Sequence, residues 1–230
     1  MDTVGLSALG GKISDAFSVH AGLRHITISG DFTTVFPSPY SSSCASGSDL
    51  GYVVVAAFEN REFALRVALT YSWTTHFDLD RTAGDAVADM PQSINLEAQS
   101  GIAANTRLFG SIRWADWTEA RIIDTAAGTL IAYDKDVFTY SPGVGRKFLD
   151  SFSGSISLGH EASQGGLAFN LAPTDGQTSV GIDGKFTSGS MKISAGVRYV
   201  RLGDASTESL GNVFTDNTAI GAGVKVAFRF

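Results

Sequence analysis

The sequence predicts an all-β protein, an antiparallel transmembrane β-barrel of the outer-membrane type. In the C-terminal segment, apolar Ile220, Val224 and Val226 alternate with small or charged residues such as Gly221 and Lys225. Several earlier segments repeat this alternation, and the connections between them are short and long in strict turn. Short turns at one end and long loops at the other are typical of barrels that sit in an outer membrane.

The composition suits one β domain over residues 1–230. The chain has 43% apolar and 17% charged residues, with 26 Gly and only 5 Pro. Such a mix favours strands and tight turns over helices. The net charge of -6, without a basic run, argues against nucleic-acid binding. The single cysteine, Cys44, lies in a Ser-rich segment expected to be a solvated loop, and forms no intramolecular disulfide.

The strands follow from the period-two pattern. In 178–186, Val180 and Ile182 oppose Gly181 and Asp183, so one face is apolar and the other polar. Together with the terminal strand, the pattern predicts about eleven strands. The clearest lie at 63–73, 92–99, 178–186 and 191–199, and weaker ones at 3–13, 17–30, 50–58, 106–117, 136–148 and 152–161.

The connections sort into two sets. The short ones are 14–16, 59–62, 101–105, 149–151 and 187–190, and the long ones are 31–49, 74–90, 118–135, 162–176 and 204–216. Aromatic residues flank both ends, as expected at two membrane interfaces. Those beside long loops are Trp73, Trp114, Trp117, Phe138 and Tyr140, and those beside short turns are Phe63, Phe148, Phe152, Phe186 and Phe228.

The odd strand count has a consequence for the start of the chain. If the last strand runs toward the short-turn side, the first begins on the external side, and two strand edges stay unpaired in lipid. Each unsatisfied backbone group there costs several kcal/mol. We therefore expect the chain to be N-terminally incomplete, lacking an odd number of strands, and not to close a stable barrel alone. The absence of a basic, apolar leader at Met1 agrees with this expectation.

Several motifs resemble the FadL-type long-chain fatty acid and hydrophobic compound transporters. The segment from Pro91-Gln92-Ser93 through Gly101 to Trp114-Ala115-Asp116-Trp117 resembles the family's strand–turn–strand unit, with its P-x-S entry and W-x-x-W exit. Further resemblances, in the family's order, lie at 17–24, 140–145 and 215–217. No segment resembles the N-terminal hatch of the family.

This resemblance implies a function and a place in the cell. FadL-type proteins are fourteen-stranded barrels that pass hydrophobic molecules inward by facilitated diffusion, without a cofactor. The implied location is the outer membrane of a Gram-negative bacterium, and the implied partners are outer-membrane lipid and a hydrophobic solute. The terminal strand, ending in Phe230, is expected to engage the barrel assembly machinery. The alternatives are a general polar, porin-like pore and a structural or adhesive barrel that binds partners through its long loops.

Charged residues on the polar face are the candidate lumen-lining residues. They form either a polar conduit or a packed salt-bridge network, and the network is favoured for any single residue. None is assigned as a ligand contact. Pro142, inside a predicted strand, suggests a bulge or a register break. The lumen candidates are Arg66, Glu97, Arg107, Arg113, Asp183, Lys185, Lys192 and Arg198.

Enzymatic and metal chemistry find little support. No Gly-x-Ser-x-Gly elbow accompanies the four histidines, so we expect no enzyme and no catalytic residue. His20 and His25 fall on opposite faces of a strand and make a poor metal pair. The aspartates at 78, 80, 85 and 89 could hold calcium, but a solvated external loop is favoured, and no metal site is expected.

Overall fold

A computed structural model of the chain describes residues 2–34, 39–79, 85–169, 171, 174–208 and 211–228. The side chains of 2–8, 34, 42, 44 and 45 are outside that description. Phe230 and Asp80 lie outside the described residues. No described helix is long and apolar enough to cross a membrane.

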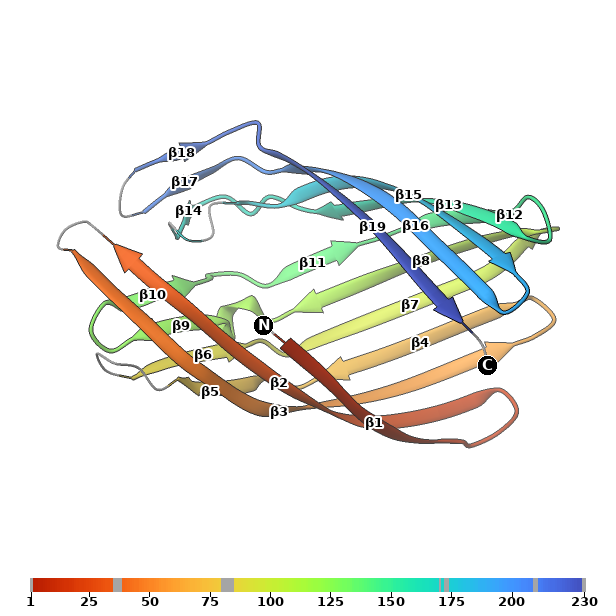
Figure 1. Cartoon of the computed structure of the whole chain (residues 1–230), viewed down its shortest axis with the longest axis horizontal. Helices are drawn as coiled ribbons and strands as arrows, with labels where there is room; N and C mark the ends of the chain where they lie inside the picture. The colour runs from red at the N-terminus through yellow and green to blue at the C-terminus, as the bar shows by residue number, and fades with distance from the viewer. Residues whose placement is uncertain are drawn as a thin grey trace.

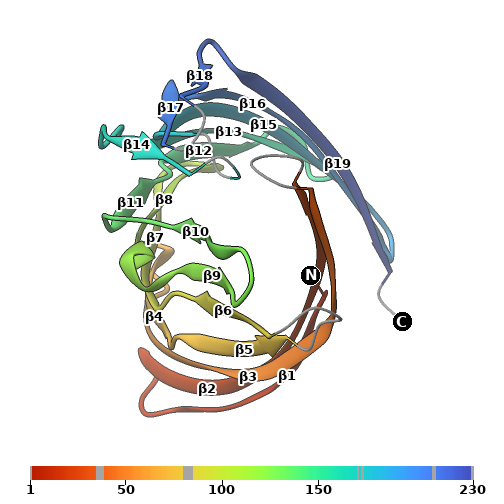
Figure 2. The same ribbon diagram turned by 90° about the vertical axis from the view of Figure 1, so that its left-hand side faces the viewer.

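The structure is a large curved antiparallel sheet with two small sheets at one end (Figures 1 and 2). The strands are β1 (Asp2–Lys12), β2 (Phe17–Thr34), β3 (Tyr40–Asn60), β4 (Leu65–Ser72), β5 (Thr75–Leu79), β6 (Ala86–Met90), β7 (Ser93–Ala103), β8 (Thr106–Ala115), β9 (Arg121–Asp124), β10 (Gly128–Ala132), β11 (Val137–Tyr140), β12 (Gly143–Lys147), β13 (Phe152–Glu161), β14 (Leu167–Ala168), β15 (Gln177–Ser188), β16 (Met191–Leu202), β17 (Ala205–Thr207), β18 (Val213–Phe214) and β19 (Thr218–Phe228). One 3-10 helix, η1, covers Trp117–Glu119.

The large sheet confirms the predicted fold class. Its 12 strands run in the order β1-β2-β3-β4-β7-β8-β11-β13-β15-β16-β19, with β12 between β8 and β13. Because β11 and β12 share one position, the sheet has eleven strand positions, as the alternation predicts. Among the described residues, β1 pairs only with β2 and β19 only with β16, so these two strands are its edges.

The two faces of the sheet differ in chemistry. Residues directly opposite each other on paired strands share a face. One such row joins Ile156, Ile182 and Val197, whose side chains are 45%, 59% and 47% exposed on the convex side. Small and charged residues occupy the alternate, concave positions. An exposed apolar outer face around a polar interior suits a sheet surrounded by lipid.

The predicted bulge or register break at Pro142 is wrong, because the strand is interrupted there but its register continues. β11 ends at Tyr140 and β12 begins at Gly143. Tyr140 pairs with Ile112 of β8 and Gly143 with Phe109, three residues further on both strands. Pro142 has no N–H to donate, yet its carbonyl accepts from the Leu158 N–H at 2.8 Å. The ladder is therefore interrupted without a shift.

The predicted loop at 31–49 is wrong, because most of it belongs to two long strands. β2 and β3 stay paired to Thr34 and Tyr40, with one irregularity between Ile28 and Gly30. Cys44, expected in a loop, is a residue of β3, paired with Gly30. The Ser- and Gly-rich composition that suggested a loop instead leaves room for β5. A Cβ at Gly47 would lie 2.6 Å from the Asp78 carbonyl oxygen and from a Leu79 methyl.

The long connections at 74–90 and 118–135 form a four-stranded sheet, β10-β9-β6-β5. We call this sheet the cap. Figure 2 shows it inside the ring of the large sheet, against β3. Phe77, Leu79 and Ala88 of the cap pack with Ile26 on the concave side of β2. The expectation of a solvated loop at 74–90 is therefore wrong, since apolar alternation in β5 buries one of its faces.

Candidate functional site

The pairing register places all eight candidate lumen residues on the concave face. Directly opposite residues on paired strands share a face, and one row of such residues crosses the sheet between two of the candidates. The row consists of Arg66, Gln99, Phe109, Gly143, Ser157, Gly181 and Arg198. Glu97 and Arg113 lie on the same face, at even spacing from Gln99 and Phe109. The alternation of apolar and polar residues in the sequence therefore indicates the face of the sheet on which each candidate lies.

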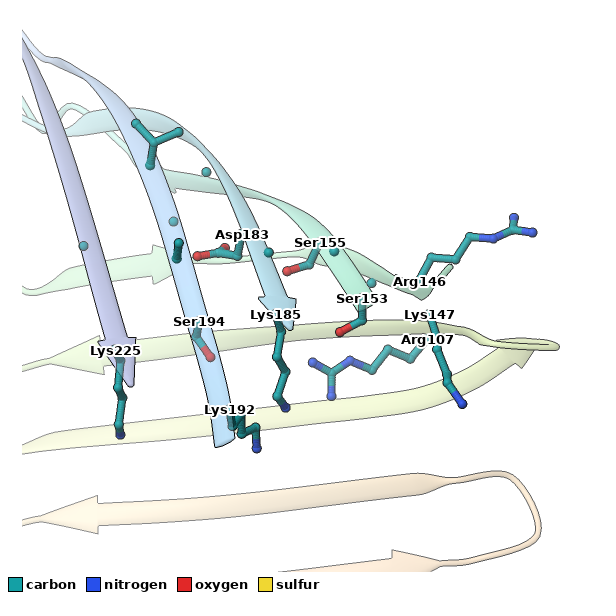
Figure 3. Close-up of a pocket in the computed structure, with 18 of the residues that line it drawn as sticks. Arg107, Arg146, Lys147, Ser153, Ser155, Asp183, Lys185, Lys192, Ser194 and Lys225 are labelled. Atoms are coloured by element: carbon teal, nitrogen blue, oxygen red, sulfur yellow. The ribbon is translucent and has the colours of Figure 1, made fainter. Parts of the chain in front are cut away.

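Five of these residues come together at one wide, open pocket of about 1200 Å³. The pocket lies at the short-turn end of the sheet, and its wall is formed largely by β8, β12, β13, β15, β16 and β19 (Figure 3). The five residues are Arg107, Asp183, Lys185, Lys192 and Arg198. Arg66, Glu97 and Arg113 are outside this pocket.

The favoured salt-bridge network is not what the described residues form. Among the eight candidates, only Arg66 makes an ion pair with a residue that the structure describes, Glu59 on the neighbouring strand at 3.2 Å. Both side chains are about half exposed, so this pair contributes little to stability. Arg198 instead lies 3.5 Å from the hydroxyls of Ser157 and Ser179.

Sequence reasoning missed two cations of the same pocket, Lys147 and Lys225. Lys225 lies on the polar row of the terminal strand, so the alternation already places it with the candidates. Lys147 follows Pro142, and its face is clear only once the register is known to continue past the break. It pairs with Ser153 of β13 and therefore faces the pocket.

A triad of polar side chains links three strands of the cap. Asp89 on β6 lies 2.6 Å from His76 Nδ1 on β5 and 3.2 Å from Arg121 Nε on β9. Asp89 is directly opposite both residues in the sheet. The predicted acidic cluster is thus split, and Asp89 has a structural partner on each side. Among the described residues, no group of three or more His, Cys, Asp or Glu side chains could hold a metal ion.

The P-x-S and W-x-x-W motifs anchor the long loops. Asp116 accepts from the Thr118 hydroxyl at 2.6 Å and from the Gln92 side-chain amide at 3.0 Å, and these bonds lower its pKa. Gln92 in turn accepts from the Tyr71 hydroxyl at 2.6 Å. Trp114 donates to Asp136 at 3.0 Å. These residues therefore fix where the cap leaves the large sheet.

A second anchored loop follows β13. Asp175 accepts from the Ser163 hydroxyl at 2.5 Å and from the N–H groups of Gln164 and Gly165 at 2.7 and 2.8 Å. Burial opposes ionisation of this carboxyl, but the hydrogen bonds outweigh burial and lower its pKa below the ordinary value of 3.8. A carboxylate that accepts several N–H bonds is held ionised in this way.

This loop should loosen in acid. Because the folded pKa of Asp175 is depressed, its contribution to stability is full above the ordinary value of 3.8 and is lost as the pH falls through the lower folded pKa. We expect the NMR signals of the Gln164 and Gly165 amides to move with a midpoint below 3.8. In Asp175→Asn this titration should vanish, whereas Asp134→Asn, nearby in the loops, should leave it unchanged. A midpoint at or above 3.8 would contradict the assignment.

No protein-family model matches the sequence, and no curated protein sequence matches it significantly. Solved structures do match in fold. A FadL homologue from Pseudomonas aeruginosa superposes on 97% of the chain with a TM-score of 0.65 at 13% identity. A deletion mutant of TodX, described as a monoaromatic hydrocarbon channel, superposes on 96% with a TM-score of 0.67 at 12% identity.

A more distant match is the outer-membrane channel DcaP of Acinetobacter baumannii, at a TM-score of 0.53, 12% identity and 96% coverage of the chain. The chain spans 65% of the length of the Pseudomonas homologue, 68% of the TodX mutant and 61% of DcaP. The fold is therefore that of FadL-type outer-membrane channels, over nearly the whole chain. The two best of these three matches are to a FadL homologue and a hydrocarbon channel, and none of the three is described as an enzyme.

Proposed function

We propose that this chain forms the greater part of a channel that carries long-chain fatty acids or other hydrophobic compounds across the outer membrane of a Gram-negative bacterium. The observation that carries the proposal is that 97% of the chain, with its two-faced sheet, superposes on a FadL homologue. Transport would be facilitated diffusion, with no covalent step and no cofactor. Binding of an apolar solute would draw on burial of its surface, about 0.8 kcal/mol per methylene group.

The alternative with specific support is a polar pore. Among the described residues, six Lys and Arg side chains and a single acid, Asp183, lie on the concave face at the large pocket. A charged lining of one sign favours passage of ions and polar solutes. Uptake of an apolar probe and conductance in a planar bilayer distinguish the two functions. An adhesive barrel would support neither.

Uptake of radiolabelled oleate and toluene, with raffinose as the polar probe, tests the proposal in a Gram-negative host that lacks its own hydrophobic channels. We expect the chain, within a closed barrel, to raise uptake of one apolar probe, and Gly223→Trp to lower that uptake about threefold. Gly223 lines the pocket and has no neighbour within 4 Å of an added Cβ, so a tryptophan there would extend from an open position toward the lumen.

Ile220→Trp is the matched control, because Ile220 lies on the same strand but on the convex face, opposite Tyr199, and is outside the pocket. Its uptake should stay within twofold of the unsubstituted protein. Uptake of raffinose alone would favour the polar pore. Uptake of neither probe above the host background would reject both channel functions.

A further inference from the structure

A row of alternating lysines and serines crosses five strands of the concave face. Lys147 of β12 pairs with Ser153 of β13, which pairs with Lys185 of β15. Lys185 pairs with Ser194 of β16, which pairs with Lys225 of β19. We call these five residues the lysine row. Figure 3 shows the Lys147, Lys185 and Lys225 side chains extending from their strands at the short-turn end of the pocket.

Most cations at this row have no acidic partner. Lys147 pairs with Asp150 in the turn at 2.6 Å. Lys185, Lys192 and Lys225 make no ion pair with any residue that the structure describes. Lys192 lies on the same face, two residues from Ser194. Its strand, β16, lies between those of Lys185 and Lys225, so like charges are near one another and repel, and an added anion lowers this repulsion.

Arg107 adds a further positive charge next to the row. Its guanidinium lies 5.3 Å from the centre of the Phe109 ring and 3.4 Å from the side-chain oxygen of Gln99. Both partners are neutral, so this charge is not compensated either. Asp183 is the one acid on the described pocket wall, and it faces Gly196 on β16 rather than a lysine.

The neighbouring row leaves room for a ligand. The adjacent row of directly opposite residues has one carboxylate and otherwise only small residues, so no large apolar side chain covers the lysines. Its members are Gly145, Ser155, Asp183, Gly196 and Gly223. Four strand spacings of about 4.8 Å give the row a length of about 19 Å. The serine hydroxyls between the lysines add neutral donors. Ammonium and hydroxyl groups spaced in this way suit an oxyanion.

We propose that the lysine row is a binding site for an oxyanion, the phosphate or carboxylate group of a small solute. The site gives the short-turn end of the lumen a preference for anions. This inference goes beyond transport of hydrophobic compounds, because it rests on charge and hydrogen-bond donors and requires no apolar contact.

Equilibrium dialysis of the chain, folded in a nonionic detergent at low ionic strength, tests the site. The probes are inorganic phosphate and benzoate, with benzyl alcohol as the uncharged counterpart of benzoate. We expect at least one anion to bind and added salt to release it. The double variant Lys185→Gln/Lys225→Gln should weaken binding at least tenfold. The thermal unfolding midpoint of this variant should stay the same or rise, since the substitutions remove repulsion between lysines. Weaker binding by a folded variant can then be attributed to the lost charges.

Arg146→Gln is the matched control, because Arg146 precedes Lys147 and points away from the pocket in Figure 3. It should bind the anions within twofold of the unsubstituted protein. Binding of phosphate alone would identify phosphate as the ligand group, and binding of benzoate alone a carboxylate. Equal binding of benzyl alcohol and benzoate, no binding of either anion, or full binding by the folded double variant would overturn the proposal. Toluene uptake is independent of these outcomes and tests the proposed channel function separately.

Discussion

Phe77→Ala is expected to release the cap from the inner wall of the sheet. Phe77 is 1% exposed and lies at the centre of the cluster with Ile26, Leu79 and Ala88. Truncating a buried phenylalanine to alanine costs about 3–5 kcal/mol, from lost burial and the cavity left behind. Since the cluster joins the cap to β2, we expect this cost to fall on cap docking. A loss of about 4 kcal/mol raises the open population roughly a thousandfold.

Hydrogen exchange measures this opening directly. The amides of β5, β6 and β9 should lose protection in Phe77→Ala, while those of β15 and β16 keep it. Phe138→Ala is the control, because Phe138 is 48% exposed on the outer face and contacts no part of this cluster. Unchanged protection of β5 and β6 in Phe77→Ala would show that the cluster does not hold the cap.

Ile182→Arg is expected to destabilise the sheet in a bilayer by about 2–4 kcal/mol, the cost of an arginine on the lipid face near the membrane midplane. Ile182 lies in the middle of β15 and is 59% exposed on the convex side. In water this exposure would make the substitution nearly neutral. The effect therefore depends on lipid at this face, and urea titration of the protein in phospholipid vesicles measures it.

Ser155→Arg is the matched control on the concave face. Ser155 is directly opposite Asp183, so the new guanidinium would have water and a carboxylate nearby. We expect a change in unfolding free energy of less than about 1 kcal/mol. Equal losses of unfolding free energy in Ile182→Arg and Ser155→Arg would mean that the convex and concave faces lie in the same environment.

The strands were predictable because each one alternates between the two faces. β4, β7, β15 and β16 begin and end within a few residues of the predicted segments, since an apolar row such as Val180, Ile182 and Phe186 has only one way to face outward. The same period places the polar residues inside, which is why Lys185 and Arg198 are found in the pocket.

The cap was not predictable from period two alone. β5 and β6 have five residues each, so their alternation is too short to distinguish a strand from a loop. Their docking depends on Gly47 and Gly51, where the absence of a side chain lets β5 approach β3. A glycine in a Ser-rich segment has the same appearance in sequence whether it serves a turn or a close approach. The lysine row likewise appears only when the register aligns five strands spread over residues 143–228.

Spin labels at consecutive positions of β15 show whether the convex face of the sheet meets lipid and the concave face meets water. Cys44 is the only cysteine, so Cys44→Ser gives a background for single labels at residues 180–186 in vesicles. We expect oxygen to reach labels at 180, 182, 184 and 186, and a water-soluble nickel complex to reach those at 181, 183 and 185. Two results would contradict the assignment of the two faces. In one, accessibility to oxygen and accessibility to the nickel complex rise and fall together along the strand, and in the other, the nickel complex reaches every position.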